Sequence, residues 1–444
     1  MAIPPPELHV RVRELEVSPG NLLDWVPEAN GILTWLGAEQ QIVGWGEALR
    51  VEVQGDHAIR EASAQWNAIA SAATVSNESS HAWADRAPFA LASFGFAAKT
   101  PGFLIVPQVA LVRRGDTTVL VTASARLEAE HPGIGTGSNT SANQRIEEFP
   151  ELPEAADATI PHEVPNPAKM RTGPGRMTQS QWRRALNELI ASLRVGAASK
   201  VVLTRDIVVH SDENIDERFL TKRLAQLYPS TWVFAVNGLI GATPEMLAAL
   251  DAGTVTSRVL AGTAAPTEGA DLFASMKNRS EHHFAVESVA RALAPLADTL
   301  EVPSEPFLLQ LPNVIHLATE VTATVPHANV LDIVDALHPT AAVCGTPTKF
   351  AFDLLEKLEG TERGRYSGPV GWIDGTGAGE FGIALRCGQL SENHREIRVF
   401  AGGGIMPDSI PDVELAETHA KMRPILDALG LDDADDTSLE GAAL

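Results

Sequence analysis

The stretch WVFAVNGLIGATPEMLAAL, residues 232–250, contains two apolar runs on either side of a glycine turn. An apolar run on each side of such a turn predicts two strands. Further apolar runs, each typical of a buried strand, occur at KVVLTRDIVV, residues 200–209, and at VTSRVLAGT, residues 255–263. SGPVGWID at residues 367–374 and EFGIALRCGQL at residues 380–390 resemble a hairpin. These strands together indicate large sheets that are mixed or antiparallel.

Helical patterns lie between and after these strands. They cover four segments, residues 178–195, 271–296, 347–358 and 411–428. Thr178 is a candidate N-cap of the first helix, and Pro347 opens the third, as proline often does in a first helical turn. Antiparallel strands with helices at intervals predict an α+β fold, in which helices surround the sheets.

The N-terminal third of the chain has a looser pattern. Residues 8–60 alternate in hydropathy as short strands do, and residues 60–78 have the alanine-rich pattern of a helix. From 135 to 177 the chain turns to Gly, Ser, Asn, Glu and Pro, which predicts a long connection. We expect a divergent N-terminal part, residues 1–160, and a core, residues 170–435, that share one fold. The N-terminal part has too little helix to close a core of its own.

Composition excludes several classes of protein. The 444 residues carry a formal net charge of −23, which argues against nucleic acid or an anionic membrane as a partner. The two cysteines, Cys344 and Cys387, are too few for a disulfide framework. No signal peptide is apparent, and the most apolar stretch, residues 87–112, is interrupted by lysine and proline. We therefore expect a cytoplasmic protein that holds any anionic substrate through a few local cations or a metal.

Taken one at a time, the polar motifs leave alternatives open. The glycines at residues 402–404 follow a strand, as in an anion-binding loop or a tight turn. EHH at residues 281–283 resembles part of a zinc site but lacks two histidines four residues apart. The glutamates and lysine of ELAETHAK, residues 414–421, share a helix face, which is typical of a solvated surface. Lys200 precedes a buried strand, so its side chain either reaches solvent or is desolvated for a purpose.

The order of the motifs is more informative than any one of them. Ten blocks follow one another between residues 178 and 430: SKVVLTRD, GATPEML, SRVLAGTAAP, SEHHFAVE, NVIHLATEV, LHPTAAVCGTPTKFAFDLLEKLE, RGRYSGPVGW, FGIALRC, FAGGGIMPDS and ELAETHAK. In this order they resemble the family of chorismate-utilising enzymes. The resemblance implies the fold of anthranilate synthase component I and an enzyme whose small-molecule substrate is chorismate.

The resemblance also implies a magnesium site. Two glutamates hold Mg²⁺ in the family, and they match Glu281 and Glu417 of this chain, while Glu414 matches a glutamate just behind them. Carboxylate oxygens and retained water suit this ion. The family often has an acidic residue three positions before Glu281, where this chain has Asn278, so the surroundings of the site differ from the family pattern.

A substrate pocket is implied by further matches. Tyr366 and Arg386 match residues that grip a substrate carboxylate, a task that suits the planar guanidinium group. The other positions implied to contact the substrate are Gly262, Thr263, His316, Ala342, Gly402, Gly403 and Lys421.

The resemblance narrows the reaction through the residue that supplies or activates the nucleophile. Family members that use a lysine nucleophile carry it where this chain has Ala261, and members that use ammonia typically lack a lysine at the position of Lys200. Members with that lysine use water. Lys200 is then the general base for attack at C2 of chorismate, and Glu245 is the general acid that protonates the departing C4 hydroxyl. The product would be isochorismate, with no glutamine amidotransferase subunit required.

Two sibling activities remain as alternatives. Salicylate synthases share both residues and then eliminate pyruvate, but the block LHPTAAVCG at residues 337–345 resembles isochorismate-forming members instead. Anthranilate synthase component I is the other alternative. The expected enzyme is an isomerase that acts as a monomer, in either menaquinone or siderophore biosynthesis, with Mg²⁺ as its only cofactor.

Overall fold

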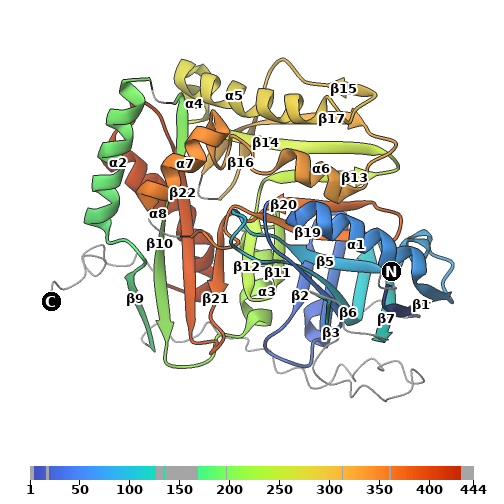
Figure 1. Cartoon of the computed structure of the whole chain (residues 1–444). Helices are drawn as coiled ribbons and strands as arrows, with labels where there is room; N and C mark the ends of the chain where they lie inside the picture. The colour runs from blue at the N-terminus through green and yellow to red at the C-terminus, as the bar shows by residue number, and fades with distance from the viewer. Residues whose placement is uncertain are drawn as a thin grey trace.

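The computed structural model describes residues 5–16, 20–126, 134–135, 169–196, 198–312, 314–359 and 362–431. Figure 1 shows long strands through the middle of the molecule with helices packed around them. This arrangement confirms the predicted α+β fold. Within the described residues, no helix has the length and apolarity that a membrane span requires.

The N-terminal part is mainly strand. Its elements are β1 (Glu7–Glu14), β2 (Leu33–Leu36), β3 (Gln40–Val53), α1 (Ala58–Ala72), β4 (Thr74–Asn77), β5 (Phe89–Ser93), β6 (Gly102–Arg114), β7 (Thr117–Arg126) and β8 (Ile134–Gly135). Two short 3-10 helices lie at Leu22–Trp25 and Ala82–Arg86. Strand β6 pairs with β3 and β7, and β7 pairs with β1.

The core alternates strands and helices. Its strands are β9 (Met170–Pro174), β10 (Lys200–Ser211), β11 (Trp232–Val236), β12 (Leu239–Thr243), β13 (Met246–Asp251), β14 (Thr254–Ala264), β15 (Thr299–Glu301), β16 (Phe307–Gln310), β17 (Ile315–Thr324), β18 (Gly345–Thr346), β19 (Pro369–Asp374), β20 (Gly379–Ile383), β21 (Cys387–Leu390) and β22 (Glu396–Ile405). Its helices are α2 (Gln179–Arg194), α3 (Glu217–Leu227), α4 (Gly269–Ala274), α5 (Met276–Leu293), α6 (Val330–Leu337), α7 (Thr348–Glu359) and α8 (Pro411–Leu429).

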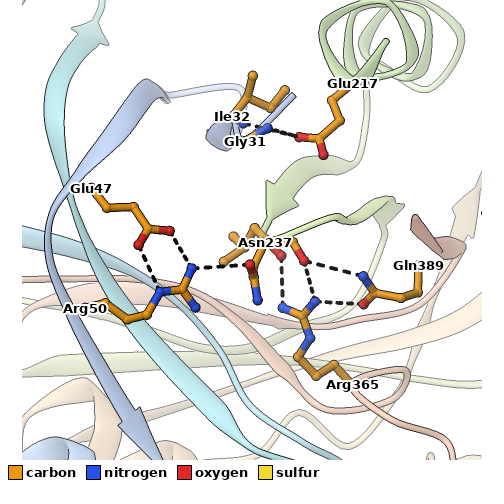
Figure 2. Close-up of polar contacts among 9 residues, drawn as sticks. Gly31, Ile32, Glu47, Arg50, Glu217, Asn237, Arg365 and Gln389 are labelled. Atoms are coloured by element: carbon orange, nitrogen blue, oxygen red, sulfur yellow. Dashed lines mark hydrogen bonds and ion pairs between the residues drawn. The ribbon is translucent and has the colours of Figure 1, made fainter. Parts of the chain in front are cut away.

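Strand pairs join the two parts of the chain. The hairpin of β11 and β12 is the one expected from residues 232–250, and β11 also pairs with β2 of the N-terminal part. Strand β19 pairs with β5 in the same way. A polar contact adds to these pairs: the carboxylate of Glu217 accepts hydrogen bonds from the backbone N–H groups of Gly31 and Ile32 (Figure 2). The N-terminal part therefore shares its hydrogen-bonding edges with the core.

Several local predictions hold in detail. Helix α2 begins after Thr178, which forms a capping box with Gln181, and Trp182 is fully buried beneath it. Helix α7 follows Pro347 directly, and Pro411 occupies the first turn of α8. Each of these boundaries depends on residues within a few positions of one another.

Three predicted boundaries were wrong. The helix predicted for residues 60–78 ends at Ala72, and Thr74–Asn77 instead form β4, which pairs in parallel with β1. The helix predicted for residues 271–296 is divided at Ser275, whose side chain accepts a hydrogen bond from the N–H of Asn278 and caps α5. Within the predicted connection of residues 135–177, Met170–Pro174 form β9, which pairs with β10. Most of that connection, residues 136–168, lies outside the described residues.

The three glycines at residues 402–404 also differ from both expectations. They form neither a turn nor a loop, because β22 runs through them to Ile405 and pairs with β10 along its length. Gly404 lies opposite Val202 and Gly402 lies opposite Thr204. This pairing brings the glycines beside Lys200, the first residue of β10.

Candidate active site

One cavity of about 260 Å³ collects the predicted site residues. It lies where β10, β14 and β22 meet the N-terminal ends of α5 and α8. The predicted residues that line it are Lys200, Glu245, Gly262, Thr263, Glu281, His316, Ala342, Tyr366, Arg386, Gly402, Glu414, Glu417 and Lys421. Residues that are far apart in the sequence thus line one cavity.

Gly403 differs from the other predicted residues. Successive residues of a strand point to opposite faces, so Gly402 and Gly404 face the cavity while Gly403 faces away from it. A Cβ atom on Gly403 would lie 3.2 Å from Oε2 of Glu414. Gly403 is therefore the one predicted residue that does not line the cavity, and it lies next to Glu414.

Gly404 was not among the predicted site residues, although it has the closest neighbours of the three glycines at residues 402–404. A Cβ atom there would lie 2.5 Å from Oε1 of Glu281 and 2.7 Å from Cε of Lys200. A Cβ atom does not approach other atoms this closely in folded proteins, so any side chain at this position would displace the end of Glu281 or of Lys200. The absence of a side chain lets β22 pass directly beside the lysine and the glutamate.

The Lys200 side chain is buried at the base of the cavity. Only 2% of it is exposed, and its Nζ atom lies 2.8 Å from Oε1 of Glu281. Of the two alternatives for Lys200, the desolvated one is correct, because Nζ is buried and does not reach solvent. Glu281 is its polar partner in this buried position.

Glu245 lies between β12 and β13, and it is also buried. Burial raises the pKa of its carboxyl group to about 8. A backbone hydrogen bond at Leu260 and the positive charges of Lys200, Lys421 and Arg386 oppose this shift without cancelling it. A carboxyl group with this pKa is mostly protonated at neutral pH, as a general acid must be.

Arg386 and His316 form a buried polar chain on the cavity wall. Nη2 of Arg386 lies 3.0 Å from Nε2 of His316, and Nδ1 of His316 lies 3.1 Å from Oγ1 of Thr263. Burial, together with the charges of Arg386 and Lys421, lowers the pKa of His316 well below its usual value. The imidazole is therefore neutral, and because arginine can only donate, Nε2 accepts and Nδ1 carries the hydrogen.

Tyr366 is held flat against the same wall. Its ring stacks on Phe400, with ring centres 5.0 Å apart and an angle of 10° between the planes. Burial raises the pKa of the phenol above its usual value, so the hydroxyl group keeps its proton. A Cβ atom on Gly402 would lie 3.3 Å from this hydroxyl oxygen, which shows how closely β22 approaches it.

The three predicted metal glutamates face the cavity from α5 and α8. Glu281 pairs with Lys200, and Oε1 of Glu414 accepts a hydrogen bond of 2.6 Å from Ser409. Glu417 forms an ion pair with Lys421, which also donates to the backbone oxygen of Gly402 at 2.9 Å. The face of α8 that carries these residues is thus part of the cavity and is not the solvated surface that its pattern alone allowed.

This donor set suits Mg²⁺. In the part of the chain that the structure describes, no group of three histidine, cysteine, aspartate or glutamate side chains stands ready to enclose a metal. Mg²⁺ does not need such a group, because it usually takes one or two protein carboxylates and completes its shell with water and substrate oxygens. Glu281, Glu414 and Glu417 offer carboxylate oxygens around one cavity, so the residues present fit this ion.

The zinc interpretation of EHH has no support in the structure. His282 lies 3.2 Å from the backbone oxygen of Ala261 and 2.7 Å from Oγ1 of Thr319, so both of its ring nitrogens have partners. Burial lowers the pKa of His282 to about 4. The side chain of His283 is 70% exposed and lies beside Glu287. His282 therefore belongs to the packing between α5, β14 and β17.

Sequence reasoning missed several residues that line the cavity, although most lie inside the ten blocks. They are Val202, Pro244, Leu260, Ala261, Asn278, Val343, Ser367, Leu385, Phe400, Ala401, Gly404 and Val413. Apolar residues and glycine carry no chemical signal of their own. Only the alternation along β10 and β22, combined with a known register, could have identified which of them face inward.

Comparison with known proteins identifies the family of the chain. A family model described as "Chorismate binding enzyme" matches residues 19–430. Isochorismate synthase DhbC of Bacillus subtilis is 35% identical over 272 residues, which are 56% of this chain and 68% of that protein. Isochorismate synthase EntC of Escherichia coli is 37% identical over 267 residues, which are 57% of this chain and 68% of that protein.

A solved structure gives the comparison over nearly the full chain. The structure of MenF, the menaquinone-specific isochorismate synthase of Escherichia coli, is 20% identical, with a TM-score of 0.74. The match covers 97% of this chain and 96% of that one. At this level of identity the likeness shows a common fold, which includes the N-terminal part.

Proposed function

The chain belongs to the chorismate-binding enzyme family, and from this premise we propose that it catalyses the isomerisation of chorismate to isochorismate. The observation that carries the proposal is that a buried lysine, Lys200, and a buried, protonated carboxyl group, Glu245, line the same cavity. A base and an acid facing one bound ring are what the addition of water at one carbon and loss of hydroxyl at another require.

Substrate binding is assigned to the cations on the cavity wall. Chorismate carries two carboxylates, and the overall charge of −23 repels such an anion. Arg386 and Lys421 offer local positive charge, and Tyr366 offers a hydroxyl group beside them. His316 keeps the guanidinium group of Arg386 in place through its neutral Nε2 atom. Two cations on one enclosed wall can bind a dianion despite the surrounding charge.

Mg²⁺ would be held by Glu281 and Glu417, with Glu414 beside them. When bound, it supplies positive charge that neutralises a substrate carboxylate. Glu414 keeps a fixed orientation because Ser409 donates to it.

The proposed chemistry exchanges one hydroxyl group for another. Lys200, in its neutral form, takes a proton from a water molecule as the water oxygen bonds to C2. The ring double bonds shift, the bond from C4 to its hydroxyl group breaks, and Glu245 donates the proton that lets this group leave as water. One water is added and one is released, so the product has the formula of the substrate and the enzyme is an isomerase. Water is the nucleophile, and no ammonia-supplying subunit takes part.

Product analysis tests this function directly. Purified protein is incubated with chorismate and Mg²⁺, and the products are separated and identified over time. Isochorismate approaching an equilibrium with chorismate is the expected result. Salicylate with an equal amount of pyruvate would replace the proposal with a lyase activity. Anthranilate formed only when ammonium is present would replace it with an amination.

A further inference from the structure

The segment from Arg363 to Ser367 carries part of the cavity wall, yet it is not a helix or a strand. Tyr366 and Ser367 line the cavity, and Ser367 has a φ of 63°, in the left-handed region. Turn hydrogen bonds link Tyr366 N–H to the oxygen of Arg363, and Gly368 N–H to the oxygen of Arg365. A strained irregular segment keeps one geometry only when its surroundings hold it.

Arg363 is the first anchor of this segment. Its guanidinium group is fully buried and forms a two-pronged ion pair with Glu359, at 2.7 and 3.0 Å. It also donates to the backbone oxygens of Val202 and Val343, each at 2.7 Å. Both valines line the cavity, so Arg363 ties the strand that begins with Lys200 to the segment just before β18.

Arg365 is the second anchor, and its guanidinium group contacts a different part of the chain. It donates to the backbone oxygens of Val236 and Asn237, at 2.9 and 2.6 Å, and to Oε1 of Gln389 at 2.7 Å (Figure 2). These acceptors lie at the end of β11, in the turn that follows it and in β21. Its acceptors are neutral, and among the described residues no carboxylate forms an ion pair with Arg365.

The N-terminal part completes this second anchor. Arg50 of β3 forms an ion pair with Glu47 and donates to Oδ1 of Asn237 at 3.3 Å (Figure 2). Asn237 has a φ of 53°, so its backbone oxygen is aimed at Arg365 from a left-handed turn. The contact thus runs from Glu47 through Arg50 and Asn237 to Arg365, next to Tyr366.

Stability alone does not account for Arg365. Burial, together with the positive charge of nearby Arg50, lowers its pKa to about 10, which reflects the cost of enclosing a cation without an anionic partner. An apolar side chain of similar volume is often neutral or better for stability at such a position. The planar guanidinium group, by contrast, can hold three acceptors in fixed directions at once.

We propose that Arg363 and Arg365 are positioning residues, which together fix Tyr366 and Ser367 on the wall of the substrate cavity. Arg50 of the N-terminal part supports the second anchor through Asn237. The proposal rests on the proposed function only in taking the cavity as the chorismate site. It assigns the N-terminal part a role in shaping that site, although Arg50 does not touch the cavity.

Arg365→Met is the decisive variant, because it leaves no buried carboxylate unpaired. We expect it to unfold cooperatively, to raise KM for chorismate and to lower kcat/KM about 10²-fold, as a small misplacement of a binding wall does. Arg365→Lys should recover only part of the loss, since an ammonium group cannot reach three acceptors in the fork geometry. Arg258→Met is the matched control: Arg258 pairs with Glu320 and stacks on Trp232, outside the cavity.

A double variant tests the role of Arg50. If Arg50 acts through Arg365, the single variant Arg50→Met should raise KM for chorismate. The same substitution should cause no further rise in KM when it is made in the Arg365→Met background. The proposal would be overturned if Arg365→Met kept the KM of the wild type. It would also be overturned if kcat fell at unchanged KM only in proportion to the loss of folded protein. The dissociation constant for chorismate, measured by calorimetry, separates this outcome from failure of the proposed function. If the wild-type protein binds chorismate but forms a different product, the comparison of dissociation constants still tests the anchors.

Discussion

The Nζ atom of Lys200 lies 2.8 Å from Oε1 of Glu281, and both side chains are largely withdrawn from solvent. The proposed general base is thus the direct neighbour of a proposed metal ligand. Gly404 makes this contact possible, because any side chain there would overlap both groups. The proposed chemistry at C2 and the proposed binding of the substrate carboxylate would therefore share one small region.

Activity should depend on Mg²⁺ and on the glutamates that would hold it. Glu281→Ala and Glu417→Ala are each expected to abolish turnover, because each removes charge that binds the ion and, through it, the substrate carboxylate. Turnover with excess chelator, and then with added Mg²⁺, is the measurement. Full turnover in chelator would contradict the metal assignment, as would a near-native rate for either variant at ordinary Mg²⁺.

Lys200 and Glu245 should affect turnover more than binding. Loss of a general acid or base typically costs about 10²- to 10⁴-fold in rate, so Lys200→Ala and Glu245→Ala should turn over poorly while still binding chorismate. Arg386→Ala should weaken substrate binding first. Rates are measured with chorismate and with isochorismate as the substrate. The same two residues must catalyse the forward and the reverse reaction, with the roles of acid and base exchanged. A Lys200→Ala enzyme that converts isochorismate at the native rate would exclude Lys200 as the catalytic residue.

The pKa of Glu245 predicts a pH dependence of activity. Because the carboxyl group loses its proton as the pH rises through about 8, kcat/KM for chorismate should fall above this pH. The profile of kcat/KM against pH in the forward direction is the measurement. An unchanged kcat/KM well above pH 8 would show that Glu245 is not the proton donor.

The same shift predicts how stability depends on pH. The folded protein keeps the Glu245 proton up to about pH 8, whereas a solvated glutamate has a pKa of 4.5. The contribution of this proton to the free energy of unfolding is therefore complete at low pH. It is lost as the pH rises through the folded-state pKa. Glu217, with a pKa raised to about 7 mainly by burial, acts in the same sense. Thermal unfolding of Glu245→Gln beside the wild type isolates Glu245, and identical pH slopes would contradict its raised pKa.

Gly404→Ala should lower activity without unfolding the protein. The new methyl group would displace Glu281 or Lys200 by overlap, and a displacement of this size at reacting groups can cost about 10²-fold in rate. Gly173→Ala in β9 is the control, because its Cβ would meet nothing closer than 3.8 Å. The melting temperature and kcat/KM of both variants are compared. Native activity in Gly404→Ala would show that the close approach of β22 does not matter.

The N-terminal part should not fold alone. A fragment of residues 1–160 would leave the edges of β2 and β5 without β11 and β19, and exposed apolar strand edges tend to aggregate. Circular dichroism and thermal unfolding of the purified fragment provide the measurement. A cooperative unfolding transition in the fragment would show that residues 1–160 form a separate domain.

Local sequence was sufficient to predict helix boundaries that depend on contacts between residues close together in the chain. The capping box of Thr178 and Gln181 fixes the start of α2 within four residues, and Pro347 marks the start of α7 in the same way. The order of the ten motifs identified the family and about half of the residues that line the cavity. The helices α3 and α6 were not predicted.

Tertiary structure decided everything that depends on strand register. Whether the glycines at residues 402–404 form a loop or a strand depends on pairing with β10, about two hundred residues earlier in the chain. That register places Gly404 beside Lys200 and turns Gly403 to the other face. The contacts of Arg365 with Asn237 and of Arg50 with Asn237 are likewise long-range. Sequence determined which chemical groups this protein carries, and tertiary structure decided which of them meet, because packing of distant strands sets those distances.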